Sequence, residues 1–160
     1  MSIGLSFNVQ EVGTRRMVRA LDRLAQANTD KLLDTTGQLI ENQVRHRIKT
    51  ERRSPKGKKW AKLSDHYAKS KKRKRPRGSL LVFDDELRDT MQHQTEQGNV
   101  VVGSALPYAA THQYGDKRLG FGTTMVTIPA RPFLGLSAQN EDDVLSTIND
   151  FFEHELGILL

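Results

Sequence analysis

Residues 84–113, DDELRDTMQHQTEQGNVVVGSALPYAATHQ, decide the fold class, because helical and strand patterns alternate within this one stretch. The acidic pair Asp84–Asp85 is suited to capping a brief helix. Gln92–Val102 then carries two strand-like runs on either side of Gly98, which is typical of a β-hairpin. Tyr108–Gln113 is expected to form a helical turn. Helix and antiparallel strands therefore follow each other closely.

Three further elements are expected before this stretch. Alternating apolar residues over Ile3–Val9 predict a half-buried strand, and helical spacing over Met17–Ala27 predicts a first helix. A second helix is expected from about Thr29 to Thr50, where apolar residues recur at helical spacing and cations gather in the last turns. The N-terminal part is thus mainly helical.

Two elements are expected after this stretch. Thr124–Ile128 has the apolar character of another strand. Asn140, followed by Asp143, resembles a capping box that opens a C-terminal amphipathic helix reaching Leu156. The sequence therefore predicts an α+β fold with two N-terminal helices, a small mainly antiparallel sheet, a C-terminal helix and a long basic loop. We expect one domain over residues 1–160.

Charge divides the chain into a basic middle and an acidic remainder. Residues 45–77 contain 16 Lys and Arg against two acids, a local balance of +14. The remaining residues hold nine basic and 17 acidic side chains, so the net +6 of the chain conceals a balance of −8 elsewhere. A segment of this kind attracts nucleic acid or an acidic protein surface.

The basic loop is predicted to cover about residues 52–78. Pro55 and Gly57 disfavour regular structure in its first part. Lys69–Gly78, KSKKRKRPRG, is expected to be exposed and flexible, because neighbouring like charges repel each other. Trp60 and Tyr67 lie between these parts at spacings that suit a short helix presenting aromatic rings.

Motifs of enzymes, metal sites and cofactor sites are missing from the sequence. There is no cysteine, and the five histidines form neither HExxH nor HxH. GxSxG, Walker-type GxxxxGK[ST] and dinucleotide-type GxGxxG patterns do not occur. We therefore expect no catalytic residue, no metal and no cofactor. No apolar run reaches membrane-spanning length, and the first residues do not resemble a signal peptide, so we expect a protein without a membrane partner.

Two kinds of partner are compatible with the basic segment, although its charges are equally compatible with a solvated face that serves solubility alone. DNA would be bound through the phosphate charges, with Trp60 and Tyr67 available for stacking on bases. An acidic protein surface would satisfy the same charges. The residues predicted to contact either partner are Lys58, Lys59, Trp60, Lys71, Lys72, Arg73, Lys74 and Arg75.

Four stretches of the chain resemble the phage virion morphogenesis family, the tail completion proteins of the Mu G-like and P2 S-like type. Their order and spacing follow the family from about Ile3 to Phe152, although Asp85 stands where glycine is expected. The stretches are Ser54–Trp60 with Leu63, Gly78–Leu81 with Leu87–Arg88, Val102–Gly103 with Tyr108–Gly115 (YAATHQYG), and Ile128–Gly135 (IPARPFLG).

The resemblance implies a structural, non-enzymatic protein that acts late in virion assembly of a tailed bacteriophage. It would finish tails or join them to heads at the neck, and would be found in the virion after assembly in the host cytoplasm. Expected partners are further copies in a ring of six or twelve, since closed head-to-tail interfaces form rings. Neighbouring neck, portal or tail proteins and packaged DNA are the others. The alternative function is that of a basic nucleic-acid-binding protein.

The family motifs also supply candidate interface residues. Aromatic and amphipathic side chains are common at protein interfaces, although Tyr108 and Phe133 are equally suited to a core. Arg131 lies in a stiff Pro-flanked segment and is expected in an ion pair or an interface. The interface candidates are Tyr108, His112, Gln113, Arg131 and Phe133.

Overall fold

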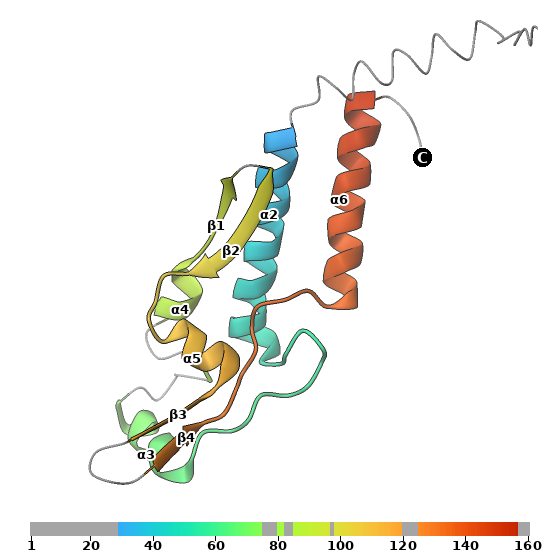
Figure 1. Cartoon of the computed structure of the whole chain (residues 1–160). Helices are drawn as coiled ribbons and strands as arrows, with labels where there is room; N and C mark the ends of the chain where they lie inside the picture. The colour runs from blue at the N-terminus through green and yellow to red at the C-terminus, as the bar shows by residue number, and fades with distance from the viewer. Residues whose placement is uncertain (1–28, 75–79, 82–84, 97, 120–124, 157–160) are drawn as a thin grey trace, which may run out of the picture.

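The computed structural model describes residues 29–74, 80–81, 85–96, 98–119 and 125–156. The strand expected over Ile3–Val9 and the first helix expected over Met17–Ala27 lie outside the described residues. Within them, a long helix runs between a β-hairpin and the C-terminal helix, and a second pair of strands lies at the far end from the hairpin tip (Figure 1). The predicted α+β class is confirmed.

The long helix is α2 (Thr29–His46), and it continues into one π-helical turn, η1 (Arg47–Glu51). Its apolar stripe reaches the core at Val44 and Ile48, which are buried. The turn ends at Arg52, which adopts a left-handed conformation and donates its N–H to the carbonyl of Arg47 at 2.9 Å. The second helix predicted to about Thr50 is thus confirmed, with its final turn widened.

The predicted hairpin is also confirmed. Strand β1 (Met91–Glu96) pairs antiparallel with β2 (Asn99–Ser104), and the connection passes through Gly98 at φ +77°. The pair packs on α2, with the short helix α4 (Glu86–Asp89) preceding it (Figure 1). Asp85 occupies the position before α4, but its side chain makes no capping hydrogen bond and pairs with Arg88 at 2.9 Å instead.

A second antiparallel pair follows the short helix α5 (Ala109–Tyr114). Strand β3 (Asp116–Leu119) pairs with β4 (Met125–Ile128), and Asp116 lies opposite Ile128. The helical turn and the last strand were expected, whereas β3 was not. The described strands form two separate two-stranded sheets instead of one small sheet.

The C-terminal helix α6 (Ala138–Leu156) runs alongside α2, and Gln43 donates across the contact to Asp143 at 3.0 Å. Its capping box lies three residues earlier than predicted. The Asn140 N–H donates to Ser137 Oγ at 3.2 Å, and the Ser137 N–H donates to Asn140 Oδ1 at 3.3 Å. Ser137 therefore caps the helix, and Asn140 is the residue that reaches back.

The basic segment requires a correction. Asp65–Lys74 forms helix α3, so residues 69–74 are helical and not a flexible loop. An acid in the first turn and cations in the last turn suit the helix dipole, which offsets part of the repulsion between the lysines. Trp60 precedes this helix instead of lying on it. The last part of the predicted loop, residues 75–78, lies outside the described residues.

The hydrophobic core lies where α2, α4 and β1 meet the segments around residues 60 and 133. Six apolar side chains make up the buried cluster of the described residues. These are Val44, Ile48, Trp60, Leu87, Met91 and Phe133.

Candidate functional site

The segment 129–135 (PARPFLG), here called the spine, connects β4 to the approach to α6 and gathers the other family motifs around it. Its backbone is bound mainly by side chains. Trp60 donates its indole Nε1–H to the Pro132 carbonyl at 2.9 Å. Gln113 Oε1 accepts the N–H groups of Phe133 and Leu134, both at 3.0 Å. The tryptophan motif and the YAATHQYG motif are therefore both attached to the IPARPFLG motif.

Arg47 holds the other side of the spine. It is fully buried, and its guanidinium donates to the carbonyls of Phe133 at 2.8 Å and Gly135 at 2.7 Å, and to Asn140 Oδ1. Burial lowers the pKa of Arg47, and Glu51 partly opposes this shift. Arg47 could not be singled out from the sequence. It is one of several cations at the end of the helix, and no local pattern distinguishes it from its exposed neighbour Lys49.

The backbones of the two longest motifs also meet directly. The Arg131 N–H donates to the His112 carbonyl at 2.7 Å. Gly115 adopts φ +79°, and a Cβ there would lie 2.9 Å from both Ala130 N and Ile128 O. Only glycine permits this approach, which explains why YAATHQYG ends in a glycine.

The Arg131 side chain is buried, with an exposed fraction of 4%. Its Nε donates to the Ala61 carbonyl at 2.9 Å and its Nη2 to the Lys62 carbonyl at 3.2 Å. The expected ion pair is not found among the described residues, since backbone carbonyls serve as its partners. Arg131 thus anchors the residues just before α3 to the spine.

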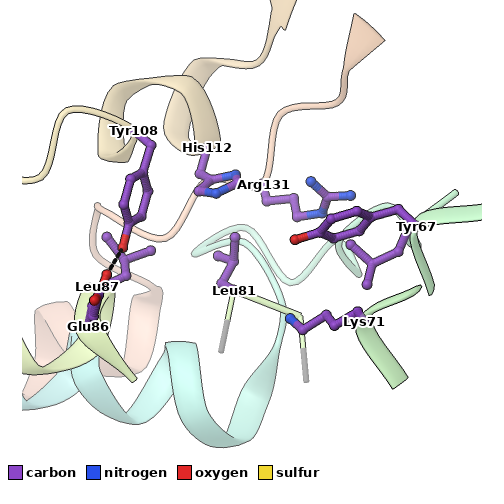
Figure 2. A pocket seen from close by; sticks show the side chains of 9 residues that line it. Tyr67, Lys71, Leu81, Glu86, Leu87, Tyr108, His112 and Arg131 are labelled. Carbon is purple, nitrogen blue, oxygen red and sulfur yellow. Dashed lines mark hydrogen bonds between the residues drawn. The ribbon is translucent and has the colours of Figure 1, made fainter. Parts of the chain in front are cut away.

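A pocket of about 290 Å³ opens beside the spine, at the side of Arg131. Figure 2 shows side chains from α3, α4 and α5 converging on it. Tyr108 donates its hydroxyl to Glu86 Oε2 at 3.0 Å and packs edge-on against His112. The lining residues are Leu63, Tyr67, Lys71, Leu81, Glu86, Leu87, Tyr108, His112 and Arg131.

Two cations of this pocket are buried. Lys71 is 6% exposed although it lies in the densest part of the basic segment. Burial lowers the pKa of Lys71, and the charge of Arg131 lowers it further. Burial also lowers the pKa of Arg131, an effect that Tyr67 partly opposes. This wall of the pocket therefore holds two cationic side chains away from solvent.

The predicted contact residues divide into two groups. Lys58, Lys59, Lys72, Arg73 and Lys74 are exposed. Trp60 and Lys71 are buried, so in this chain the Trp60 ring is part of the core and has no free face for a base. Arg75 lies outside the described residues.

The interface candidates also divide. Phe133 is completely buried and belongs to the core, and Gln113 and His112 are half-buried beside the spine. Tyr108 is 38% exposed at the mouth of the pocket. Tyr108 and His112 therefore share one pocket with Arg131.

The described residues contain neither a metal-binding cluster nor a membrane-spanning helix. No group of three or more His, Asp or Glu in this part of the chain is arranged to hold a metal ion. None of the described helices combines the length and apolar character needed to cross a membrane.

Comparison with known proteins agrees with the motif resemblance. The chain is 34% identical over 148 residues to "Mu-like prophage FluMu G protein 2" of Haemophilus influenzae, covering 91% of this chain and 92% of that protein. It is 28% identical over 156 residues to "Putative capsid assembly protein G" of Escherichia phage Mu, covering 91% and 94%. No solved structure matches.

The family itself is matched over nearly the whole chain, since residues 11–153 align with it. This family is structural and not enzymatic, in agreement with the prediction from the motifs. Its four motifs are the segments that meet around the spine and the adjoining pocket. The chain belongs to the phage virion morphogenesis family, and is a Mu G-like bacteriophage protein of virion assembly.

Proposed function

We propose that this protein completes tails or joins them to heads at the neck of a tailed phage, as a homo-oligomeric ring of six or twelve copies. The observation that carries the proposal is the family match over residues 11–153, which includes every motif around the spine. The relative from phage Mu bears a name for capsid assembly, which also refers to the building of the virion. Neck, portal and tail proteins are the proposed neighbours.

Apolar surface and open sheet edges support a role as an assembling subunit. Each described sheet has two strands, so its outer edges are not paired with a third described strand, although α2 side chains bind the Met91 carbonyl and the His93 N–H of β1. Large apolar side chains outside the core would be covered in a ring. Those more than 40% exposed are Tyr67, Val101, Tyr114, Met125, Val126 and Leu145.

The second candidate is binding of nucleic acid. It is favoured by the exposed cations of α3, Lys72, Arg73 and Lys74, together with Lys58 and Lys59. In the neck, the same cations would contact either packaged DNA or acidic surfaces of adjoining proteins. Binding to duplex DNA by the isolated protein should weaken with salt with a slope of about −0.9 per phosphate neutralised. An absence of such binding would leave protein contact as their role.

Electron microscopy of a lysate lacking this gene is the test. We expect filled heads and separate tails without infectious particles, and restoration of joined particles by the wild-type gene supplied in trans. Immunogold labelling of complemented virions should place the protein at the neck. A normal yield of infectious virions from the null mutant would overturn the proposal.

A further inference from the structure

Helix α6 carries apolar side chains on a side that does not face α2. Asp143, which accepts a hydrogen bond from Gln43, and Thr147, which lines a pocket shared with α2, mark the side of α6 that faces α2. Leu145 lies two residues from each of them, so it is turned by about 200° around the helix axis. Its exposed fraction is 57%.

Ile148 and Phe152 continue this apolar side along the helix, because residues at i, i+3 and i+7 share one face. Both side chains are half-buried, and no apolar side chain of α6 belongs to the buried cluster of the described residues. Leu145, Ile148 and Phe152 are together called the α6 stripe. An apolar stripe left partly in solvent is typical of a surface that another polypeptide covers.

The surroundings of the α6 stripe are acidic. Residues 138–156 contain six Asp and Glu and neither Lys nor Arg. Glu141, which is exposed, lies four residues before Leu145 at the start of the stripe. A matching occupant therefore combines apolar side chains with a net positive charge.

Residues 15–27 of the chain, RRMVRALDRLAQA, have both properties. They contain four Arg against one acid. Met17, Leu21 and Leu24 recur at helical spacing, and this apolar repeat covers residues 17–24, the same length as residues 145–152 of the α6 stripe. Two apolar stripes of equal length can pack against each other as a pair of helices.

We infer that the α6 stripe is the docking site for residues 15–27 of a neighbouring copy of the chain. The inference rests on the proposed assembly of the protein into a ring. Helix α2 begins at Thr29, beside the last turns of α6 (Figure 1), so residues 15–27 are connected to the subunit at this outer end of the helix pair. A contact between one segment of each copy and a different face of the next is head-to-tail, and such contacts close into rings.

Two segments of the same copy fit the stripe less well. The helix expected to end at Ala27 leaves only Asn28 before α2, whereas two antiparallel helices need a connection of about 2–5 residues. Residues 157–160 follow α6 directly, but four residues span at most about 14 Å. Leu145 lies about 16 Å along the axis from the end of α6 at Leu156, which is beyond their reach.

The first experiment measures self-association of the purified full-length protein by sedimentation velocity over a range of concentrations. Leu145→Gln puts an amide into the α6 stripe, and Leu21→Gln does the same in the proposed docking segment. We expect each change to weaken association about tenfold or more, the effect of losing one well-packed side chain from an interface. Ser146→Gln, which puts the same amide on another side of α6, is the control and should stay near wild type.

Thermal melting separates loss of contact from loss of fold. Leu145 is more than half exposed and lies outside the buried cluster, so Leu145→Gln should melt within a few degrees of wild type. If this variant is unfolded, Leu21→Gln replaces it. Weakened association of folded Leu21→Gln supports the inference, and unchanged association contradicts it.

The second experiment identifies the occupant by cysteine cross-linking, since the chain has no cysteine of its own. Leu21→Cys and Leu145→Cys are prepared as separate proteins, mixed and oxidised. We expect a mixed disulfide between them, in higher yield than between Leu21→Cys and the control Ser146→Cys.

Two cross-linking results would overturn the inference. Disulfide-linked dimers of Leu145→Cys alone, in equal or higher yield, would show that the α6 stripe meets the same stripe of a second copy. A disulfide confined to single chains of the double variant Leu21→Cys/Leu145→Cys would show that each copy covers its own stripe.

Further results separate this inference from the proposed function. Unchanged association of Leu145→Gln and Leu21→Gln, with the protein still located at the neck, would refute the docking and leave the function standing. A wild-type protein that stays monomeric at all concentrations would likewise refute the docking. Absence of the protein from the neck would refute the proposed function, whereas the mixed disulfide would still support the contact between copies.

Discussion

His93 on β1 is held between two carboxylates of α2. Its Nδ1 lies 2.7 Å from Glu41 Oε2, and its Nε2 lies 3.1 Å from Asp34 Oδ1. Glu41 also pairs with Arg45 at 2.7 Å. Gly37 makes room for the ring, because a Cβ there would lie 2.5 Å from His93 Cδ2. The hairpin is thus fastened to α2 by a histidine that lies between two carboxylates.

This clamp should make stability depend on pH. Hydrogen bonds to Glu41 and then Asp34 raise the pKa of His93, although burial opposes them. A raised folded-state pKa stabilises the fold fully below the unfolded value of about 6.5, and this contribution is lost as pH rises through the folded pKa. We expect the stability difference between wild type and His93→Gln, measured by urea unfolding from pH 5.5 to 9, to shrink as pH rises.

The exposed His66 on α3 provides the control for this experiment. His66→Gln should change stability little at any pH, because exposed substitutions generally stay within about 0.5 kcal/mol. A His93→Gln difference that is constant from pH 5.5 to 9 would show that His93 contributes by packing and not by its charge.

Gly115 offers a test of the contact between the motifs. Gly115→Ala places a Cβ against the Ile128 and Ala130 backbone, whereas Gly98→Ala, at a similar φ of +77°, meets open space. Gly98→Ala should cost about 1–2 kcal/mol for its left-handed conformation. Gly115→Ala should lower the free energy of unfolding by about 1–3 kcal/mol more, because overpacking is added. Equal losses in denaturant unfolding would contradict the close approach.

The spine shows how an extended segment is fixed without a regular sheet. Side chains from α2–η1, the segment before α3 and α5 bind its backbone, so its position depends on three parts of the chain that are distant in sequence. Gln113 makes three of these bonds, and Arg47 makes two from a fully buried position.

Arg47→Met should therefore detach the spine. The change leaves the carbonyls of Phe133 and Gly135 without this donor, and each buried unsatisfied group costs about 1–3 kcal/mol. We expect a loss of roughly 3 kcal/mol or more in urea unfolding. Lys49→Met, an exposed cation of the same turn, is the control and should be nearly neutral.

Arg47→Lys should also be destabilised, because a single ammonium group does not reproduce the fork of guanidinium donors. Full stability of Arg47→Lys would show that charge alone, and not the bond geometry, holds the spine.

The chain as a whole has a pronounced separation of charge, and six apolar side chains form the buried cluster of its described part. Exposed cations on α3 contribute little to stability in such an arrangement. These cations therefore remain available to bind a partner. The outer edges of the two-stranded sheets and the exposed apolar residues offer further contact area. These features agree with a subunit that buries its exposed apolar residues when it assembles with other proteins.

Replacing Lys72, Arg73 and Lys74 together by Gln should therefore separate folding from assembly. Glutamine keeps the helix propensity of α3 while removing three charges. We expect the melting temperature to stay within a few degrees of wild type, and incorporation into particles or salt-dependent DNA retention to fall. A large loss of melting temperature with normal incorporation would mean that these cations serve the fold.

Elements with a local pattern could be predicted from the sequence. The stripe of α2, the Gly98 hairpin and the long apolar repeat of α6 depend on spacing within one segment. The motifs also identified the family, because their order along the chain is a property of the sequence. The separation into basic and acidic parts is equally visible there.

Long-range packing decided the rest. Cations that are close in sequence take opposite environments, as with Arg47 against Lys49 and Lys71 against Lys72, because tertiary contacts and not local spacing bury one member of each pair. The basic segment becomes helical through the dipole and its packing beside Arg131, although charge repulsion predicted a flexible loop. The pocket exists because segments near residues 67, 87, 108 and 131 converge, and a linear pattern carries no distance between such segments.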